Sequence, residues 1–239
     1  MTKLSVNVNK IATIRNARGG NIPNLTQVVK DCQNFGADGI TIHPRPDERH
    51  ITTKDVYEIR EVIETEYNIE GYPDQRYLNL IKDIRPHQAT LVPDSPHVLT
   101  SDNGWNTSEN MTFLQDVCAE IKSLGIRCSI FVNPNEKDIL DAAQINVDRI
   151  ELYTGPYAMK FEKNKEEAIK MYVNASKQAV ALGIGVNAGH DLNLNNLLFF
   201  KRSIAQLDEV SIGHALISDA LYLGLENTIQ LYKKMLQQQ

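Results

Sequence analysis

The sequence predicts a TIM-type (β/α)8 barrel that forms a single domain over residues 1–239, and two observations support this prediction. Eight short β-like runs alternate with helix-like segments, and no Gly/Ser-rich linker or low-complexity tract interrupts them. Alternating β and α units form a parallel sheet, and eight units in about 250 residues have the size of such a barrel. A doubly wound open sheet is the alternative, but the turn after the first strand lacks its Gly-rich phosphate fingerprint.

The expected strands are short runs of β-like composition bounded by turn residues. They cover residues 3–8, 38–43, 67–72, 89–93, 127–132, 148–154, 183–189 and 208–214. Three of the intervening segments carry apolar residues at helical spacing, namely residues 25–36, 53–66 and 164–183. The first and third of these end at a glycine, as helices often do, and Thr53 is the expected N-cap of the second.

Composition and charge narrow the range of functions. The chain is 42% hydrophobic with a net charge of −5, so a broad basic surface for nucleic acid is not expected. The N-terminus lacks the apolar run of a signal peptide, and no window approaches the roughly 18 apolar residues of a membrane span. Cys32, Cys118 and Cys128 are odd in number and widely spaced, and the last two lie in apolar patterns typical of buried residues. We expect a soluble, cytoplasmic protein with no nucleic-acid or membrane partner.

Most of the histidines fall at the carboxyl ends of expected strands or in the loops that come after them, where barrel active sites gather. The exception, His87, precedes the fourth strand. The others are His43, His50, His97, His190 and His214. Imidazole carries protons near neutral pH, so these residues are acid–base candidates, although each alone could be structural or solvated. Their spacing matches no compact metal-ligand motif, and a metal site assembled from separate strands is the less favoured alternative.

The last two expected strands end with the same pair of residues, Gly189-His190 in "NAGHDL" and Gly213-His214 in "SIGHAL". Barrels of this type often bind phosphate in these two loops. Glycine lets the backbone approach a ligand, and the N-termini of the next helices would direct N–H groups at the same point. The sequence therefore indicates an anion site, with two ordinary turns as the equal alternative.

The loop after the second strand, "HPRPDERH", is another candidate anion site. Arg45 offers a planar guanidinium that fits a phosphate, and His50 adds a donor. Pro44 and Pro46 restrict the backbone, which reduces the entropy lost on binding. Arg49 is either a further cation of this site or an exposed surface charge.

A long loop and two glutamates in strands each have both a functional and a purely structural interpretation. Segment 94–110 is much longer than a typical βα loop and holds the only tryptophan, Trp105, so it is either a lid over the substrates or a surface excursion. Glu70 and Glu151 lie in otherwise apolar strands, where burial would raise their pKa and suit them to acid–base work. A structural pairing with arginine is the alternative for each glutamate.

Together these motifs resemble those of the pyridoxine 5′-phosphate synthase family. The shared stretches are, in chain order, "NVNKIATIRNARGG", "GADGITIHPRPDERHIT", "YNIE", "LVP", "IELYTG", "VNAGHDL" and "SIGHAL". They extend over essentially the whole chain and are specific as a set, although each is weak alone. The resemblance implies a TIM-barrel enzyme of the transferase class that performs the closing step of the deoxyxylulose-phosphate route to vitamin B6.

The resemblance also implies the reaction and the partners. Family members condense 1-deoxy-D-xylulose 5-phosphate with 3-amino-2-oxopropyl phosphate, which gives pyridoxine 5′-phosphate, inorganic phosphate and water. The expected partners are therefore two phosphorylated small-molecule substrates, and no cofactor or metal is expected. A homo-oligomer, an octamer of paired barrels, is implied as well, with Arg18 reaching into a neighbouring subunit's site.

The same resemblance implies roles for individual residues. His43 and Glu70 are expected to accept protons, His190 to donate one, and Glu151 to stabilise charged intermediates. The residues expected to hold deoxyxylulose phosphate are Asn9, Lys10, Arg45, His50 and Thr100. Those expected to engage the amino ketone phosphate are Asn7, Arg18, Asp191 in the 190–191 turn, Gly213 and His214.

This chain departs from many relatives at two places. Asn9-Lys10 stands where many family members carry Asp-His, and Lys10 could still bind an anion as a point charge. Asp191 stands where many carry glycine, and a carboxylate near a phosphate is unfavourable unless it turns away.

Two other functions stay open. Lys10 lies at a strand end and could form a Schiff base, as in lysine-dependent aldolases acting on phosphorylated sugars; borohydride would then trap an adduct. A non-catalytic binder of phosphate metabolites would bind phosphate esters without turnover. The joint presence of Glu70, His43 and His190 favours an enzyme, because a binder has little use for so many acid–base groups.

Overall fold

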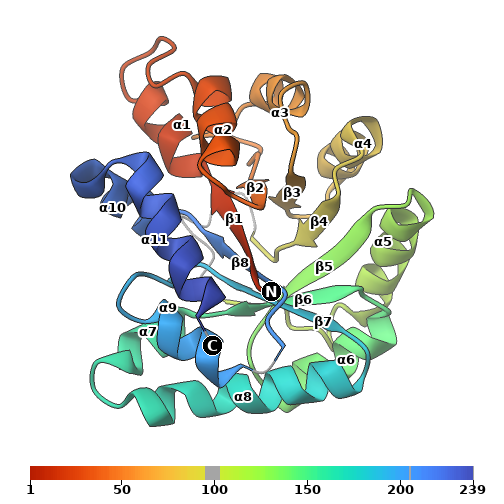
Figure 1. Cartoon of the computed structure of the whole chain (residues 1–239). Coiled ribbons are helices and arrows are strands. Elements are labelled where there is room, and N and C mark those ends of the chain that lie inside the picture. Colours follow the sequence, from red (N-terminus) through yellow and green to blue (C-terminus); the bar gives the residue numbers. More distant parts are fainter. Residues whose placement is uncertain (95–102, 205, 239) are drawn as a thin grey trace.

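The computed structural model describes residues 1–94, 103–204 and 206–238. Parallel strands succeed one another in chain order around a closed barrel, and β8 pairs back onto β1 (Figure 1). The strands are β1 (Lys3–Asn7), β2 (Gly39–Ile42), β3 (Glu66–Gly71), β4 (Gln88–Leu91), β5 (Arg127–Val132), β6 (Arg149–Tyr153), β7 (Gly185–Gly189) and β8 (Glu209–Ile212). The predicted barrel is confirmed, and each expected strand lies within two residues of its predicted limits.

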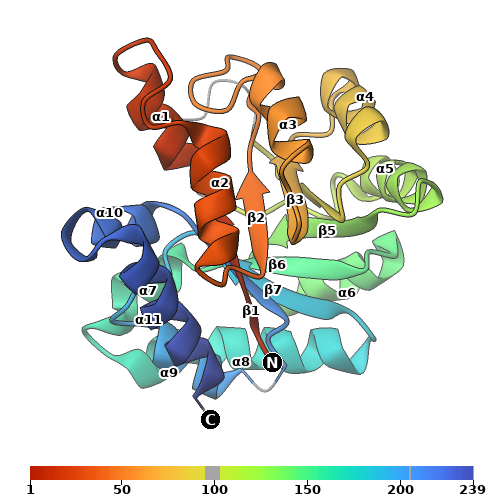
Figure 2. The same ribbon diagram turned by 45° about the horizontal axis from the view of Figure 1, so that its top comes forward.

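Helices surround the barrel on all sides, and both chain termini lie at the same end of it (Figures 1 and 2). The helices are α1 (Asn9–Asn16), α2 (Leu25–Asn34), α3 (Thr53–Arg60), α4 (Gln75–Ile84), α5 (Met111–Ser123), α6 (Glu136–Ile145), α7 (Gly155–Phe161), α8 (Lys165–Ala181), α9 (Leu197–Ser203), α10 (His214–Leu223) and α11 (Leu225–Gln237). Among the residues that the structure describes, no helix has both the length and the apolar character needed to cross a membrane.

Two of the boundaries that differ from the prediction have an identifiable cause or consequence. Helix α3 is capped by Thr52 rather than Thr53, because Thr52 Oγ1 accepts a hydrogen bond from the Asp55 N–H and the Asp55 carboxylate accepts one from the Thr52 N–H. This reciprocal capping box satisfies two N–H groups that the helix leaves free. Strand β8 ends at Ile212, so His214 is the first residue of α10 instead of the last of the strand.

The inside of the barrel is polar, whereas the residues between the strands and the helices are apolar. The apolar residues between strands and helices include Leu4, Ile40, Ile69 and Ile130, which are all fully buried. Inside, the Ser5 and Thr41 hydroxyls lie 2.7 Å apart, and Asn68 Nδ2 donates to Thr41 Oγ1 at 3.2 Å. Asn187 Nδ2 reaches across to Gln88 Oε1 at 3.4 Å. Branched aliphatic side chains usually fill such barrels, so this hydrogen-bonded layer is a distinctive support for the strand ends above it.

The three cysteines, Cys32, Cys118 and Cys128, are free thiols without exposed surface. They lie in α2, α5 and β5 and belong to the hydrophobic core. This confirms the interpretation of Cys118 and Cys128 as small buried hydrophobic residues.

Candidate active site

A cavity of about 730 Å³ opens at the carboxyl ends of the strands, where the active sites of such barrels lie. Twelve of the fourteen site residues expected from the sequence line it. They are Asn7, Asn9, Lys10, His43, Arg45, His50, Glu70, Glu151, His190, Asp191, Gly213 and His214. The other lining residues are Thr13, Arg49, Val92, Phe131, Asn193, Ser211 and Ala215. Folding thus gathers residues from both ends of the chain around one space.

Arg18 and Thr100 are the two expected residues that are not among these twelve. Arg18 is exposed in the stretch after α1 and does not line the cavity. Thr100 lies outside the described residues, as do His97 and the rest of 95–102. The roles expected for these residues stay predictions.

The second half of the long segment after β4 is fixed to the barrel. Trp105 is 3% exposed, its Nε1 donates to Leu91 O at 2.9 Å, and its backbone N–H donates to Phe131 O at 2.9 Å. Thr107 Oγ1 donates to the Asp141 carboxylate of α6 at 2.9 Å. Residues 103–110 are therefore anchored, and the lid interpretation now concerns only the part that lies outside the described residues.

Glu70 and His43 form the central acid–base pair of the cavity. Glu70 Oε2 lies 3.9 Å from His43 Nδ1 and accepts a hydrogen bond from Asn7 Nδ2 at 3.5 Å. Burial raises the pKa of Glu70 to about 7. Burial, and after it the charge of Arg45, lowers the pKa of His43 well below 6.5. A neutral imidazole therefore faces a carboxyl group that titrates near neutrality, an arrangement suited to proton transfer.

Glu151 is a second buried carboxyl group in the same cavity. It is 4% exposed, and burial together with repulsion from Glu70 and Glu209 raises its pKa well above the ordinary value. Among the described residues its Oε2 has no hydrogen-bond partner. A side chain on Gly189 would collide with the Glu151 carboxyl group, so this glycine makes room for the acid as well as for a ligand. Burial therefore favours the protonated form of Glu151 more than it would for an exposed glutamate.

The first two residues of α1 occupy the position where this chain departs from many relatives. Asn9 Oδ1 accepts a hydrogen bond from the His43 N–H at 2.9 Å, and the Asn9 N–H donates to Asn7 Oδ1 at 3.1 Å. Lys10 lines the cavity beside them. Asn9 therefore fixes the backbone of His43, while Lys10 adds a positive charge to the wall.

The loop after β2 supplies cations and a neutral hydrogen-bond donor. Arg45 is 4% exposed, and its Nη2 lies 2.5 Å from Asp94 Oδ2. The Ile51 N–H donates to His50 Nδ1 at 2.9 Å, which places the ring proton on Nε2. Burial, and after it the charge of Arg45, lowers the pKa of His50 to about 4. Arg49 also lines the cavity, so it belongs to this cationic group.

Two neighbouring helices hold this loop in place. Arg15 of α1 donates from Nη2 to His50 O at 3.3 Å and forms a two-point ion pair with Asp55, at 2.5 Å and 2.8 Å. Arg76 of α4 donates to Pro44 O at 2.5 Å. The loop that carries Arg45 and His50 is therefore rigidly supported, which reduces the ordering needed when a ligand binds.

The turn after β7 places His190 in a left-handed backbone conformation with φ of +95°, which is rare outside glycine. Thr154 stabilises this turn from the end of β6. Its buried Oγ1 donates to Gly189 O at 2.7 Å and accepts from the Asp191 N–H at 3.1 Å. Thr154 was not among the expected site residues, and its place directly after β6 is the one sequence signal for this role.

Replacing Thr154 with valine is expected to destabilise the protein by about 1–3 kcal/mol, because the Gly189 carbonyl and the Asp191 N–H lose their partner in a buried place. Urea unfolding at fixed protein concentration measures this free energy. Thr154→Ser keeps the hydroxyl and serves as the control, with a smaller expected loss. Equal stability of the two variants would contradict the assigned role of the hydroxyl.

The two Gly-His turns lead into different structures. After β8, α10 begins directly at His214, so its N-terminus borders the cavity as expected for an anion site. After β7, residues 190–196 come before α9, so the helix N-terminus expected at that turn is absent there. A Cβ on Gly213 would lie 3.1 Å from Asn7 Cβ, so glycine also permits the close contact of β8 with β1.

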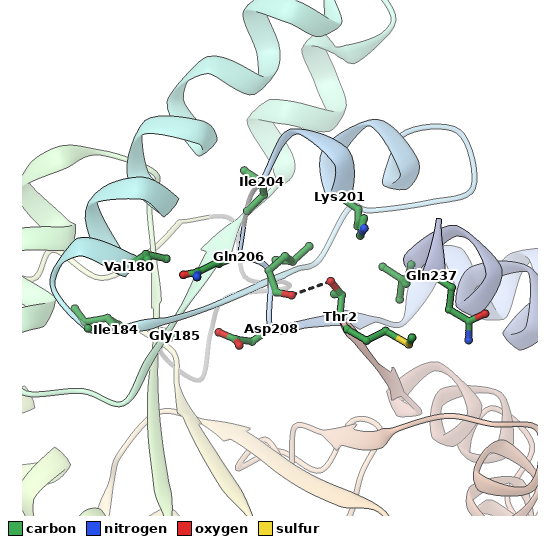
Figure 3. A pocket seen from close by; sticks show the side chains of 13 residues that line it. Thr2, Val180, Ile184, Gly185, Lys201, Ile204, Gln206, Asp208 and Gln237 are labelled. Atoms are coloured by element: carbon green, nitrogen blue, oxygen red, sulfur yellow. Dashed lines mark hydrogen bonds between the residues drawn. The ribbon is translucent and has the colours of Figure 1, made fainter. Parts of the chain in front are cut away.

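A second cavity, of about 750 Å³, lies at the opposite end of the barrel, near the chain termini (Figure 3). None of the expected site residues that the structure describes lines it. Two of its polar side chains already hydrogen-bond within the protein: Thr2 Oγ1 donates to Leu207 O at 2.8 Å (Figure 3), and Asp208 Oδ2 accepts from the Val186 N–H at 2.8 Å. Only the first cavity combines the acid–base and cationic groups in the described part of the chain.

Known proteins match this sequence over almost its whole length. The family model for "Pyridoxal phosphate biosynthesis protein PdxJ" matches residues 4–238. A pyridoxine 5′-phosphate synthase from Bacteroides fragilis is 58% identical over 236 residues, which cover 99% of this chain and 100% of the relative. One from Cytophaga hutchinsonii is 56% identical over 236 residues, with 99% of both chains covered.

Solved structures of other proteins share the barrel. Phosphoribosylanthranilate isomerase from Thermotoga maritima has a TM-score of 0.61 at 14% identity, with 100% of both chains covered. Tryptophan synthase from M. tuberculosis has a TM-score of 0.64 at 13% identity, with 98% of this chain and 91% of that chain covered. At such identities the likeness shows the fold alone.

Proposed function

We propose that the cavity at the carboxyl ends of the strands is the site where pyridoxine 5′-phosphate is made. The chain belongs to the PdxJ family of pyridoxal phosphate biosynthesis proteins and is an enzyme that synthesises pyridoxine 5′-phosphate. The substrates are 1-deoxy-D-xylulose 5-phosphate and 3-amino-2-oxopropyl phosphate, and the products are pyridoxine 5′-phosphate, inorganic phosphate and water. The observation that carries this proposal is the cavity itself, which joins Glu70, His43 and His190 to a cationic loop and a helix N-terminus.

The proposed reaction needs several proton transfers. The amine of one substrate attacks the ketone of the other to give an imine and then an enamine, and phosphate leaves. Water adds, and an aldol-type closure and a dehydration make the pyridine ring. His43 and Glu70 accept protons, since His43 is neutral and Glu70 titrates near neutrality. His190 donates one, and Glu151, whose pKa is raised by burial, stabilises charged intermediates from the wall of the cavity.

Two anion sites suit two phosphorylated substrates. Arg45 and His50 are proposed to hold the phosphate of the deoxyxylulose substrate, with Asn9 and Lys10 beside it and Thr100 as a further contact. The remaining contacts, to the amino ketone phosphate, are assigned to Asn7, Asp191, Gly213 and His214, at the N-terminus of α10.

We propose a homo-oligomer, an octamer of paired barrels, working in the cytoplasm. The exposure of Arg18 outside the cavity of its own subunit supports a role for it in a neighbour's cavity. Large apolar side chains are exposed on α1, after it and on α10, which pack together in the fold. They are Ile14, Ile22, Leu221 and Tyr222. A surface of this kind is typical of a subunit interface.

The proposal is tested by incubating the purified protein with both substrates and measuring pyridoxine 5′-phosphate and released phosphate. Equal amounts of the two products are expected. Binding of both substrates without either product would instead support the non-catalytic binder.

Lys10→Met separates the proposed synthase from the Schiff-base aldolase. With Lys10 as a point-charge contact, the variant is expected to keep its turnover while KM for deoxyxylulose phosphate rises by roughly ten-fold. Borohydride is expected to trap no adduct on the wild type. Lys54→Met, at an exposed position of α3, is the matched control. Complete loss of turnover in Lys10→Met together with a trapped adduct would favour the aldolase.

A further inference from the structure

His190 and Asp191 are consecutive residues whose side chains contact each other. His190 Nδ1 lies 2.7 Å from Asp191 Oδ2, the distance of a charge-assisted hydrogen bond. The side chains are 32% and 39% exposed, so the pair is partly shielded from water and remains open to the cavity. Neighbours in sequence seldom turn toward each other, and here the left-handed backbone of His190 accompanies that turn.

The backbone of Asp191 is fixed at both of its polar groups. Its N–H donates to Thr154 Oγ1 at 3.1 Å, and its carbonyl accepts from Asn196 Nδ2 at 3.2 Å. Asn196 is 2% exposed, so this second contact is itself held by the core. The Tyr153 ring meets the His190 ring edge-on at 5.9 Å. Backbone contacts and ring packing therefore hold the carboxylate against Nδ1.

We propose that Asp191 is a positioning residue that keeps His190 in its protonated form, with Nδ1–H bound to the carboxylate and Nε2–H as the group that donates the proton. The inference rests on the proposed function only in naming the substrate as the acceptor of the His190 proton. The protonation state of the imidazole does not depend on the proposed function. Asp191 thereby acts through His190 and has no contact of its own with the reacting atoms.

The electrostatic surroundings agree with this arrangement. Burial alone would lower the pKa of His190, but the hydrogen bond and charge of Asp191, and then the charges of Glu70 and Asp94, raise it above 6.5. The groups that act on His190 come from different elements. They are Asp191 in the same loop as His190, Glu70 in β3, Asp94 after β4 and Tyr153 in β6. Positive charge in the same cavity opposes the effect, and it comes from Lys10, Arg45 and Arg49.

The pair also removes the conflict between a carboxylate and a nearby phosphate. An isolated carboxylate at an anion site would repel the substrate. Paired with an imidazolium, Asp191 contributes no net charge, while its backbone stays beside the cavity. Asp191 at this position is therefore compatible with phosphate binding.

Asp191→Asn tests the proposal, because the amide keeps the shape of the side chain and removes its charge. The His190 imidazole is titrated by NMR in protein labelled at histidine Cε1, with its signal identified by its loss in His190→Asn. The midpoint of this titration is expected to move to lower pH. In parallel, kcat/KM for synthesis is expected to fall about ten-fold at pH 8 and to fall much less at pH 6.

Asp116→Asn, on the exposed face of α5, is the control for loss of one surface charge and is expected to leave the titration unchanged. An unchanged His190 midpoint in Asp191→Asn overturns the proposal, whatever the activity. A lower KM for the amino ketone phosphate without a change in the pH profile also overturns it, because Asp191 would then act only by repelling the anion. A shifted midpoint in a protein that makes no pyridoxine 5′-phosphate supports the pair and refutes the proposed function instead.

Discussion

Glu70→Gln is expected to lower kcat by about 10²-fold or more, because the amide cannot accept a proton where the carboxylate does. The side chain keeps its size, and its carbonyl can still accept from Asn7 Nδ2, so substrate binding should change far less than turnover. Steady-state measurement of kcat and KM for each substrate separates these two effects. Glu64→Gln, at an exposed position before β3, is the control.

The pH profile gives a second, independent sign of the same role. Burial places the pKa of Glu70 at about 7, so the proton-accepting carboxylate is lost as the pH falls through 7. The wild-type kcat/KM should therefore rise with pH on its acid limb. It should fall again at higher pH, as His190 loses the proton that it donates. In Glu70→Gln the acid limb near pH 7 is expected to vanish from the residual activity. A variant that keeps both its turnover and this limb would rule out Glu70 as the base.

The parts of the fold that the sequence predicted are those set by local pattern. Short apolar runs and their flanking turn residues identify strands without knowledge of the rest of the chain, and β2 and β5 were located in this way. The carboxyl ends of parallel strands then necessarily share one end of the barrel. This single geometric rule accounts for the meeting of His43, Glu70 and His190 in one cavity.

The parts that the sequence did not predict depend on contacts between distant or competing groups. Thr52 and Thr53 are equally good N-caps by residue type, and only the side chain of Asp55 decides between them. Thr154 acquires its role because β6 and β7 are neighbours in the barrel. His190 adopts a backbone conformation with φ of +95°, which is uncommon for any residue other than glycine. Residue type alone does not reveal these features, because each depends on which partner the side chain or backbone meets in the folded chain.

The ion pair of Arg15 with Asp55 is the tertiary contact with the largest expected effect on stability. Its side chains are 10% and 6% exposed, and two hydrogen bonds join the guanidinium to the carboxylate. Arg15→Met keeps the aliphatic bulk and leaves the Asp55 charge without its cation. Removing one partner of a buried pair typically costs about 3–5 kcal/mol, and the expected loss here is about 3 kcal/mol because Thr52 still donates to Asp55. Urea unfolding at pH 7 and fixed protein concentration measures it.

The pH dependence of this loss separates the ion pair from simple packing. Burial alone would raise the pKa of Asp55, but hydrogen bonds from Arg15 and Thr52 outweigh it and hold the pKa below the ordinary value. A depressed carboxyl pKa stabilises the fold above the unfolded-state pKa, and this contribution disappears as the pH falls through the folded value. Wild type and Arg15→Met should therefore approach each other in stability at acid pH, whereas a packing defect would persist.

The same substitution is expected to affect substrate binding more than chemistry. Arg15 also donates to His50 O, so its loss frees the loop that carries Arg45 and His50. We expect KM for deoxyxylulose phosphate to rise by roughly ten-fold with a much smaller change in kcat, because Glu70 and His43 are held by other contacts. Asp55→Asn is the matched variant, and a double-mutant cycle with Arg15→Met isolates the energy of the pair. Additive losses in that cycle would show that the two side chains act independently, and the loop would then owe its rigidity to Arg76 and the prolines instead.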